Sequence, residues 1–491
     1  MRLMSCQSLY PRVRNIVLFV LSGCLSTMLV AMNHLECGAQ GLSLRLAGRW
    51  EGAFSKNQEV RNYYNEVWGW DDPHSDRAYA IIGSADSIHF IDVSDPENAY
   101  QVDAFAGRAS DASHRDIKTY RHYAYAVGEG AQGSLQIFDL QHLPDSVVKV
   151  YDHDSLVVTA HNLFVDNKRL YVAGIATYGA QYPMSVLSLE QPTAPRLITH
   201  MLRARTSIGY VHDVFVRNDT AYCAAAGDGL FRVDFTEPEA YALIDYLVVY
   251  PESGYNHSGW VHEASGRYIM ADETHGTRLK VVDFHDSLPE PRVTELFGYR
   301  SGAGSIVHNP FVRDNFIFTS YYHEGVQVFS INEDGAGVRH VAGYDTYPRN
   351  DGFSPEERYR DFEGCWGVYP FFKDGLIVAS DQLRGLFLFR LEQAHHVEPQ
   401  SSRSMDGRPS APSFAAPNPF RRQTVLHVPG PLFDVDVRLF DMQGRVIRVE
   451  RHQQWAAETS WQAPSSLPAG TYCLELRHRS GAHYIRLQIM P

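Results

Sequence analysis

The sequence has few cysteines, and none of them stands in a spacing typical of a metal-binding or disulfide-rich domain. Six cysteines occur in 491 residues, and three of them fall within the first 37 positions. Cys223, Cys365 and Cys473 form no CxxC pair and have no histidine at zinc-finger distance. Neither a zinc finger nor a disulfide framework is indicated, and we expect these three side chains to act as small buried hydrophobes.

The chain also lacks the excess of basic residues that a nucleic-acid partner requires. Lys and Arg total 44 against 57 Asp and Glu, which gives a net charge of −13. A negative field of this kind repels phosphate backbones and offers no attraction to anionic lipid. We therefore expect no nucleic acid as a partner.

Common enzyme motifs are absent as well. The sequence contains no GxSxG elbow, no HExxH pair, no P-loop and no GxGxxG that follows a strand and opens a helix. The glycine-rich stretches Glu129–Gly133 and Gly227–Gly229 are typical of hairpin loops instead. No catalytic class is therefore indicated by a local motif.

What the sequence does contain is one strand pattern repeated seven times. Short apolar runs end in an acidic or polar turn, and two further strands precede each run, with another following most of them. The runs are Ile88–Val93, Leu135–Leu140, Met184–Leu189, Leu230–Phe235, Leu279–Phe284, Val326–Ile331 and Leu386–Leu391. About four strands in about 45–50 residues, with no helical periodicity between them, predict the blades of a β-propeller.

The last repeat lacks its fourth strand, and the missing strand is found at the other end of the domain. Leu44–Trp50 precedes the first repeat and is similar to Arg339–Tyr344, a fourth strand. A strand from the N-terminus that completes the last blade would close the ring and leave no open sheet edge. The predicted fold class is therefore all-β, with a seven-bladed propeller over residues 42–393.

Three stretches resemble a known family of propellers. They are His114–Leu140, Asn256–Glu273 and His308–Ile331. Over residues 65–391 the chain resembles LVIVD-repeat propellers, and within them the choice-of-anchor B proteins. The resemblance implies a propeller with a variable C-terminal anchor, and it implies no general activity.

The C-terminal region is predicted to form a separate small domain. A segment rich in Ser, Pro and Ala, residues 394–416, is interpreted as a linker. Alternating runs around a Gln-Gly turn then predict an antiparallel β-sandwich over residues 417–491. This domain carries three short motifs, PNPF, DMQGRV and LPAGTY, which include Pro417, Asn418, Pro419, Phe420, Gly444, Gly470 and Tyr472.

Together these three motifs resemble the type A C-terminal sorting domain of the type IX secretion system. The resemblance implies that the chain crosses the outer membrane of a Bacteroidota-like bacterium. It also implies that the secretion machinery is a partner and that the tail is removed.

The N-terminus carries an export signal. Arg12 and Arg14 precede an apolar run, Ile16–Met32, in the order typical of a signal peptide. Cleavage before Gln40 is favoured, which makes residues 1–39 the signal peptide. Acylation at Cys24 in a lipobox-like context is the alternative, and a retained membrane anchor is a third. A secreted or cell-surface location is expected, and release or anchoring of the final form stays open.

Five histidines occupy the same place in consecutive blades, just before the first strand, at spacings of 47, 51, 45 and 51 residues. They are His114, His161, His212, His257 and His308. In a propeller the first strands line the channel, so we expect these side chains to converge at one end. Trp68 and Trp366 take this place in the first and last blades, and the polar neighbours are Asp116, Asn162, Asp213 and Asn309.

The histidines have two functional interpretations and one structural one. They offer ligands for a divalent metal such as zinc, copper or nickel, or bind an anion when protonated. Alternatively, each histidine bonds a carbonyl of the neighbouring blade and only stabilises the ring. Asp272 and Glu273 either add carboxylates to the channel mouth or form a solvated turn.

Three functions follow from these interpretations. The favoured one is a monomeric, exported propeller that binds a ligand or a surface partner, with a divalent metal as its one candidate cofactor. The first alternative is a metal-dependent hydrolase or lyase with Asp213 or Glu273 as general base. The second is a purely structural surface protein. The fold alone does not choose among them.

Overall fold

The computed structural model describes two compact units, Met1–Ala394 and His395–Pro491. The described residues are 41–52, 63–110, 112–130, 132–284, 290–299, 305–347, 362–393, 414–416, 418, 420–428, 432–441, 446–464, 467–478 and 481–490. The predicted signal peptide, Cys24, most of the linker, and Pro417, Pro419 and Gly444 of the sorting motif lie outside them. Within the described ranges, no helix combines the length and apolar character needed to cross a membrane.

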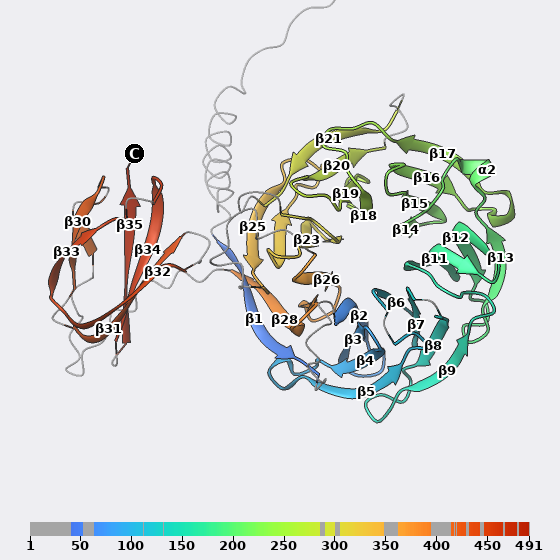
Figure 1. Cartoon of the computed structure of the whole chain (residues 1–491), viewed down its shortest axis with the longest axis horizontal. Coiled ribbons are helices and arrows are strands. Elements are labelled where there is room, and N and C mark those ends of the chain that lie inside the picture. The colour runs from blue at the N-terminus through green and yellow to red at the C-terminus, as the bar shows by residue number, and fades with distance from the viewer. Residues whose placement is uncertain are drawn as a thin grey trace, which may run out of the picture. The chain divides into compact units, whose positions relative to one another are not determined.

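Seven four-stranded antiparallel sheets make up the first unit and are arranged as blades around a central axis (Figure 1). Six blades are built from consecutive strands, the first strand of each lying nearest the axis. Blade 1 is β2 (Tyr64–Asp71), β3 (Ala78–Ser84), β4 (Ser87–Asp92) and β5 (Tyr100–Ala106). Blade 2 is β6 (Arg115–Tyr120), β7 (Tyr123–Gly128), β8 (Leu135–Asp139) and β9 (Val148–His153). Blade 3 is β10 (Asn162–Asp166), β11 (Arg169–Thr177), β12 (Ala180–Ser188) and β13 (Arg196–His200).

The next three blades follow the same order. Blade 4 is β14 (Asp213–Arg217), β15 (Thr220–Ala224), β16 (Leu230–Asp234) and β17 (Ala242–Leu247). Blade 5 is β18 (Asn256–Val261), β19 (Tyr268–Asp272), β20 (Leu279–Asp283) and β21 (Arg292–Phe297). Blade 6 is β22 (Pro310–Arg313), β23 (Phe316–Ser320), β24 (Val326–Ser330) and β25 (Arg339–Tyr344). Helical turns are short: α2 (Arg203–Thr206), η2 (Pro96–Asn98) and η3 (Pro238–Ala240).

Blade 7 joins the two ends of the propeller. It consists of β26 (Cys365–Tyr369), β27 (Leu376–Asp381), β28 (Gly385–Gln393) and the N-terminal strand β1 (Leu42–Trp50). The strand β1 pairs antiparallel with β28 along its whole length, from Leu42 opposite Gln393 to Trp50 opposite Leu386. The prediction that an N-terminal strand completes the last blade is confirmed.

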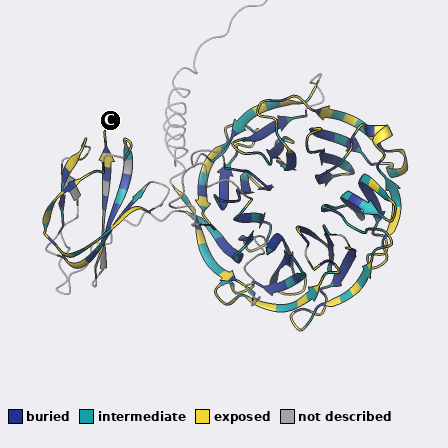
Figure 2. Cartoon of the chain, in the orientation of Figure 1, coloured by how far each residue is buried: buried dark blue, intermediate teal, exposed yellow. Residues whose placement is uncertain are grey.

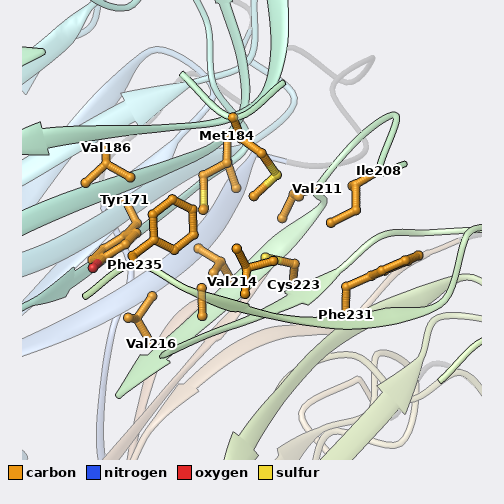
Figure 3. Packing of buried hydrophobic residues seen from close by; sticks show 14 of the residues in the cluster. Tyr171, Met184, Val186, Ile208, Val211, Val214, Val216, Cys223, Phe231 and Phe235 are labelled. Atoms are coloured by element: carbon orange, nitrogen blue, oxygen red, sulfur yellow. The ribbon is translucent and has the colours of Figure 1, made fainter. Parts of the chain in front are cut away.

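Burial decreases from the axis to the rim of the propeller (Figure 2). All seven residues of β3 are buried, whereas every residue of the outer strand β5 is exposed or half-buried. Between blades, apolar side chains of one sheet pack on the next, as Tyr171 and Met184 of blade 3 do with Val214, Cys223 and Phe231 of blade 4 (Figure 3). This stacking of apolar faces is what holds neighbouring blades together.

The second unit is a β-sandwich. One sheet contains β29 (Phe414–Ala416), β30 (Gln423–His427) and β33 (Glu458–Gln462). The other contains β31 (Leu432–Asp441), β32 (Val446–Trp455), β34 (Gly470–His478) and β35 (Gly481–Ile489). Side chains from both sheets share one core, in agreement with the predicted sandwich. The strand β29 comes from the end of the segment that the sequence indicated as a linker.

Described residues of two of the C-terminal motifs, PNPF and LPAGTY, support this sandwich structurally. Phe420 is buried in its core, and the Tyr472 hydroxyl donates a hydrogen bond to the Pro468 carbonyl at 2.8 Å. The side-chain oxygen of Asn418 accepts a hydrogen bond from the Gln488 amide at 2.8 Å. Gly470 begins β34. These contacts give the motif residues a role in the domain's own fold.

Candidate metal centre at the propeller axis

The five repeated histidines lie side by side at the axis of the propeller. Three of them directly precede the first strands β6, β10 and β14, His257 lies in β18, and His308 stands just before β22. The ring centroids of successive histidines are 4.5 Å (His114–His161), 3.8 Å (His161–His212), 4.4 Å (His212–His257) and 4.3 Å (His257–His308) apart. Equivalent positions in successive blades thus bring together residues up to 194 positions apart in the sequence, from 114 to 308.

Trp366 of blade 7 closes this arc into a ring of six side chains. Its indole lies 5.4 Å from His114 and 5.0 Å from His308 between ring centroids. A register shift between Cys365 and Gly367 accompanies this placement. We call the five histidines and Trp366 the histidine ring.

Trp68 does not occupy the place at the channel mouth that the repeat indicated. Its indole packs on Tyr369 at 5.0 Å and donates a hydrogen bond to the Thr119 hydroxyl at 3.1 Å. In β26, Trp366 lies within a register shift of the strand, and the residues at the corresponding shift of β2 are Asn65 and Glu66, whereas Trp68 lies further along β2, opposite Ile81. Blade 1 therefore contributes no aromatic side chain to the histidine ring.

A buried polar layer lies next to the ring and contains the predicted neighbours of the histidines. The Asp116 carboxylate accepts from the Lys118 ammonium at 2.6 Å and from the Leu163 amide of blade 3 at 2.5 Å. Asn162 of blade 3 accepts from the Val214 amide of blade 4 at 3.3 Å. These two side chains link successive blades, so the repeated structural task falls on them and not on most of the histidines.

Glu66 belongs to the same layer, although no motif or repeat position indicated it. Its carboxyl accepts hydrogen bonds from the Asn309 side chain and from the Val67 amide, both at 3.0 Å. Burial raises the pKa of Glu66 to about 8, and burial likewise raises the pKa of Asp213 to about 7. With Lys118, these side chains surround a cavity of about 20 Å³, which is enough for one water molecule.

Beyond the polar layer, large aromatic side chains fill the axis. Phe215 lies 5.2 Å from Phe164 and 4.7 Å from Trp260, and Trp260 lies 5.1 Å from Phe311, between ring centroids. Contacts at these distances are typical of packed aromatic pairs. The first strands therefore place three successive layers along the axis, namely imidazole, polar and aromatic.

The raised pKa of Glu66 predicts a pH-dependent gain in stability for Glu66→Gln. A carboxyl whose pKa is higher in the folded state loses stabilisation as the pH rises from the unfolded value toward the folded one. Between pH 4.5 and about 8, the wild-type chain should therefore lose stability relative to the variant. At pH 8.5 we expect the variant to be more stable by on the order of 2 kcal/mol. Urea denaturation at pH 5 and pH 8.5 measures this, and an unchanged difference between the two pH values would contradict it.

Two carboxylates that follow second strands reach the histidine ring. The Glu273 carboxylate lies 3.8 Å from both His257 Nε2 and His308 Nε2, and it accepts a hydrogen bond from the Tyr322 hydroxyl at 2.5 Å. The Glu129 carboxylate lies 2.8 Å from His161 Nδ1. Glu129 and Glu273 directly follow β7 and β19, the second strands of blades 2 and 5, and this shared position was the signal that could have identified Glu129.

Asp272 was predicted, together with Glu273, to lie at the channel mouth, but it lies away from the histidine ring. Its carboxylate is fully buried and paired with the Lys280 ammonium at 2.7 Å. The Tyr250 hydroxyl and the Asn256 amide donate to it at 3.0 and 3.1 Å. Asp272 therefore supports blade 5, and only Glu273 of this pair reaches the ring.

Three of the imidazoles form a hydrogen bond through Nδ1, which leaves Nε2 as the free nitrogen. His308 Nδ1 lies 2.5 Å from the Trp366 carbonyl and donates to it, since a carbonyl only accepts. His161 Nδ1 donates to Glu129 in the same way, and His212 Nδ1 shares a hydrogen bond with the Tyr255 hydroxyl at 3.1 Å. His212 Nε2 is buried and has no hydrogen-bond partner among the described residues.

The charge state of the ring favours a cation over an anion. Burial lowers the pKa of His114, His212 and His257 well below the usual range, with repulsion between the imidazoles adding to it, and burial lowers that of His308 to about 3. These four rings are therefore neutral at pH 7, and neutral imidazole is the form that binds metals. Two groups of three residues each offer ligand atoms that all lie within 4.8 Å of one another. These groups are His161–His212–His257 and His257–Glu273–His308.

No family model and no curated protein matches this sequence. Among solved structures, the chain is similar to the β-propeller domain of Cps50 (Swd1) from Myceliophteria thermophila, with 11% identity, a TM-score of 0.47, and coverage of 71% of this chain and 100% of that one. It is similar to the WD40 repeats of RRP9, with 10% identity, a TM-score of 0.48, and coverage of 72% and 99%. The computationally designed Ika8 protein gives 9% identity, a TM-score of 0.41, and coverage of 70% and 99%. These likenesses concern the fold alone.

Proposed function

We propose that this protein is an exported β-propeller that binds a divalent transition metal ion at its histidine ring. The observation that carries this proposal is the position of the Glu273 carboxylate, 3.8 Å from Nε2 of both His257 and His308. Two nitrogens and one oxygen form a ligand set that zinc, iron, copper and nickel accept.

The contact between Glu273 and His308 leaves two acceptors facing each other. His308 donates its Nδ1 proton to the Trp366 carbonyl, so its Nε2 carries a lone pair. Glu273 presents a carboxylate oxygen, and at 3.8 Å a proton on either group would not form a hydrogen bond. A cation between them removes the repulsion. The separation suits two ligands that each lie about 2.0–2.2 Å from a shared ion.

The position of Glu273 is held from blade 6. Tyr322 donates its hydroxyl proton to the Glu273 carboxylate at 2.5 Å, and its ring lies 4.7 Å from that of His308. The backbone of Tyr322 has a φ of 36°, a conformation that bulky side chains rarely adopt. Strain of this kind persists where the surroundings enforce it, and it is common at functional sites.

Export is the second part of the proposal. It rests on the charged and apolar N-terminal segment and on the C-terminal motifs that resemble a type IX sorting domain. The secretion machinery is then a partner of the tail, and the propeller is delivered outside the cell as an LVIVD-type surface or secreted module. Detection of the protein in the medium or on intact cells, and its loss when residues 417–491 are deleted, would test this.

Binding is proposed without an assigned reaction. In the alternative function, a metal-dependent hydrolase or lyase, Asp213 or Glu273 would act as the general base. Asp213 follows His212 at the start of β14 and lines the cavity of the polar layer, and Glu273 is occupied as a ligand. Neither carboxylate is left in the ring to take up a proton from a bound substrate.

Metal analysis of untagged protein tests the proposal. We expect wild-type protein to retain zinc, copper or nickel after dialysis. The pair His212→Ala and His308→Ala should weaken binding at least about 100-fold, and Glu273→Gln should do so at the position between His257 and His308, because ligands are lost. Glu66→Gln is the matched control, since its buried carboxyl lies outside the ring. Metal-free wild-type protein whose melting is unchanged by chelator and by added zinc would contradict the proposal.

A further inference from the structure

We infer that the histidine ring holds two metal ions, with His257 between them. This inference rests on the proposed metal binding and deepens it. The two groups of close ligand atoms, His161–His212–His257 and His257–Glu273–His308, share only His257. One ion bound by Glu273 and His308 leaves His161 and His212 without a role, although they are arranged as ligands.

The first group has the features of a prepared metal site. His161 donates its Nδ1 proton to the Glu129 carboxylate at 2.8 Å, so its Nε2 lone pair is available. A carboxylate behind a histidine is the usual arrangement around metal-binding imidazoles, because it fixes the tautomer and raises ligand basicity. His212 is held at Nδ1 by the Tyr255 hydroxyl, and its buried Nε2 has no hydrogen-bond partner among the described residues.

His257 can serve both groups because neither of its nitrogens is used in a hydrogen bond among the described residues. Its Nε2 lies 3.8 Å from Glu273, and its Nδ1 is buried without a partner. Its ring lies 4.4 Å from that of His212 and 4.3 Å from that of His308, so it stands equally near both groups. A buried N–H without an acceptor is unfavourable, and coordination of both nitrogens removes that cost.

The second ion requires a defined proton balance. A neutral imidazole has one lone pair, so His257 coordinates two ions only when its N–H bond breaks and that nitrogen forms a bond to the second ion. The proton leaves to solvent, and no electron is transferred. Loading the second ion should therefore release one more proton than loading the first with the same ion.

The two positions differ in their ligands and in their exposure. One position offers three imidazoles, and the other offers two imidazoles and a carboxylate. Copper and nickel should therefore bind more tightly at the position with three imidazoles. His161 and Glu129 are the members nearest solvent, with side-chain exposures of 13% and 36%. Ions and exchangeable water would therefore enter on the side of blades 2 and 3.

Titration of untagged, metal-free protein with copper(II) tests this inference. We expect the wild-type chain to bind 2 equivalents, and electron paramagnetic resonance to show coupled ions with a reduced signal at full loading. Glu273→Gln and His161→Ala should each bind 1 equivalent with an uncoupled signal, and His257→Ala should disrupt both sites. Glu66→Gln, as the control, should bind 2 equivalents. Circular dichroism and melting establish that each variant is folded.

The outcomes separate this inference from the proposed function. Wild-type protein that binds 1 equivalent, lost equally in Glu273→Gln and His161→Ala, would overturn the second ion and leave metal binding in place. Wild-type protein that binds none would overturn both. Where a variant does not fold, the wild-type titration decides, because a single break at 1 equivalent without additional proton release contradicts a second ion.

Discussion

Removal of residues 42–50 is expected to abolish cooperative folding of the propeller. The strand β1 covers the edge of β28 and buries Leu44 and Trp50 in two different inter-blade cores. Burial of two such side chains contributes about 3–6 kcal/mol, and each ladder hydrogen bond adds about 0.5–1.5 kcal/mol. The sum is comparable to the whole free energy of unfolding of a typical domain, about 5–15 kcal/mol.

A comparison of chains that begin at residue 40 and at residue 51 measures this effect by thermal and urea unfolding. The shorter chain should be insoluble or melt without a cooperative transition, and a synthetic peptide of residues 42–50 should restore part of the transition. Arg45→Ala is the control on the same strand, because its side chain is 53% exposed. A truncated chain with unchanged melting would show that β1 does not close the ring.

The second large effect is expected for Asp116→Asn, which should cost about 3–5 kcal/mol of stability. The substitution keeps the shape of the side chain but removes the charge that pairs with Lys118 at 2.6 Å. The Lys118 ammonium is then left in a site where its side chain is 8% exposed. The new amide group also cannot accept both backbone hydrogen bonds, from Ile117 and Leu163, that the carboxylate accepts.

Urea denaturation of four proteins resolves this prediction. The double variant Asp116→Asn with Lys118→Met should recover much of the loss, because it no longer buries an unpaired ammonium. Lys168→Met is the control for loss of a surface pair, since Lys168 and Glu190 are 51% and 70% exposed, and it should change stability by less than about 1 kcal/mol. A loss below about 1 kcal/mol for Asp116→Asn would show that the buried pair does not stabilise the axis.

The propeller could be predicted because its repeat is visible in the sequence. Seven apolar runs of equal length and a single missing strand leave few alternatives for the connectivity, and the strand Leu42–Trp50 is where the count requires it. The convergence of the histidines could be expected for the same reason, since His161, His212 and His257 occupy equivalent positions of consecutive blades.

The remainder of the site depends on features that a repeat pattern does not encode. Trp366 lies within a register shift of β26 and is placed beside His114, whereas Trp68 lies beyond the corresponding shift of β2 and is not placed in the ring. Tyr322 lies in the connection after the second strand of blade 6, where composition varies from blade to blade. Which nitrogen of each imidazole is free depends on partners distant in sequence, such as the carbonyl of Trp366 for His308.

The strand pairing that closes the propeller and the proposed metal ligands lie in different blades. The proposed ligands come from blades 3, 4, 5 and 6, whereas β1 pairs with β28 in blade 7 and joins the two ends of the domain there. Local opening is most frequent where a terminal strand detaches from its neighbour. Such an excursion would expose amides of β1 and β28 to exchange with solvent and leave all five proposed ligands in position. The propeller can therefore fray at its closure without releasing what it binds.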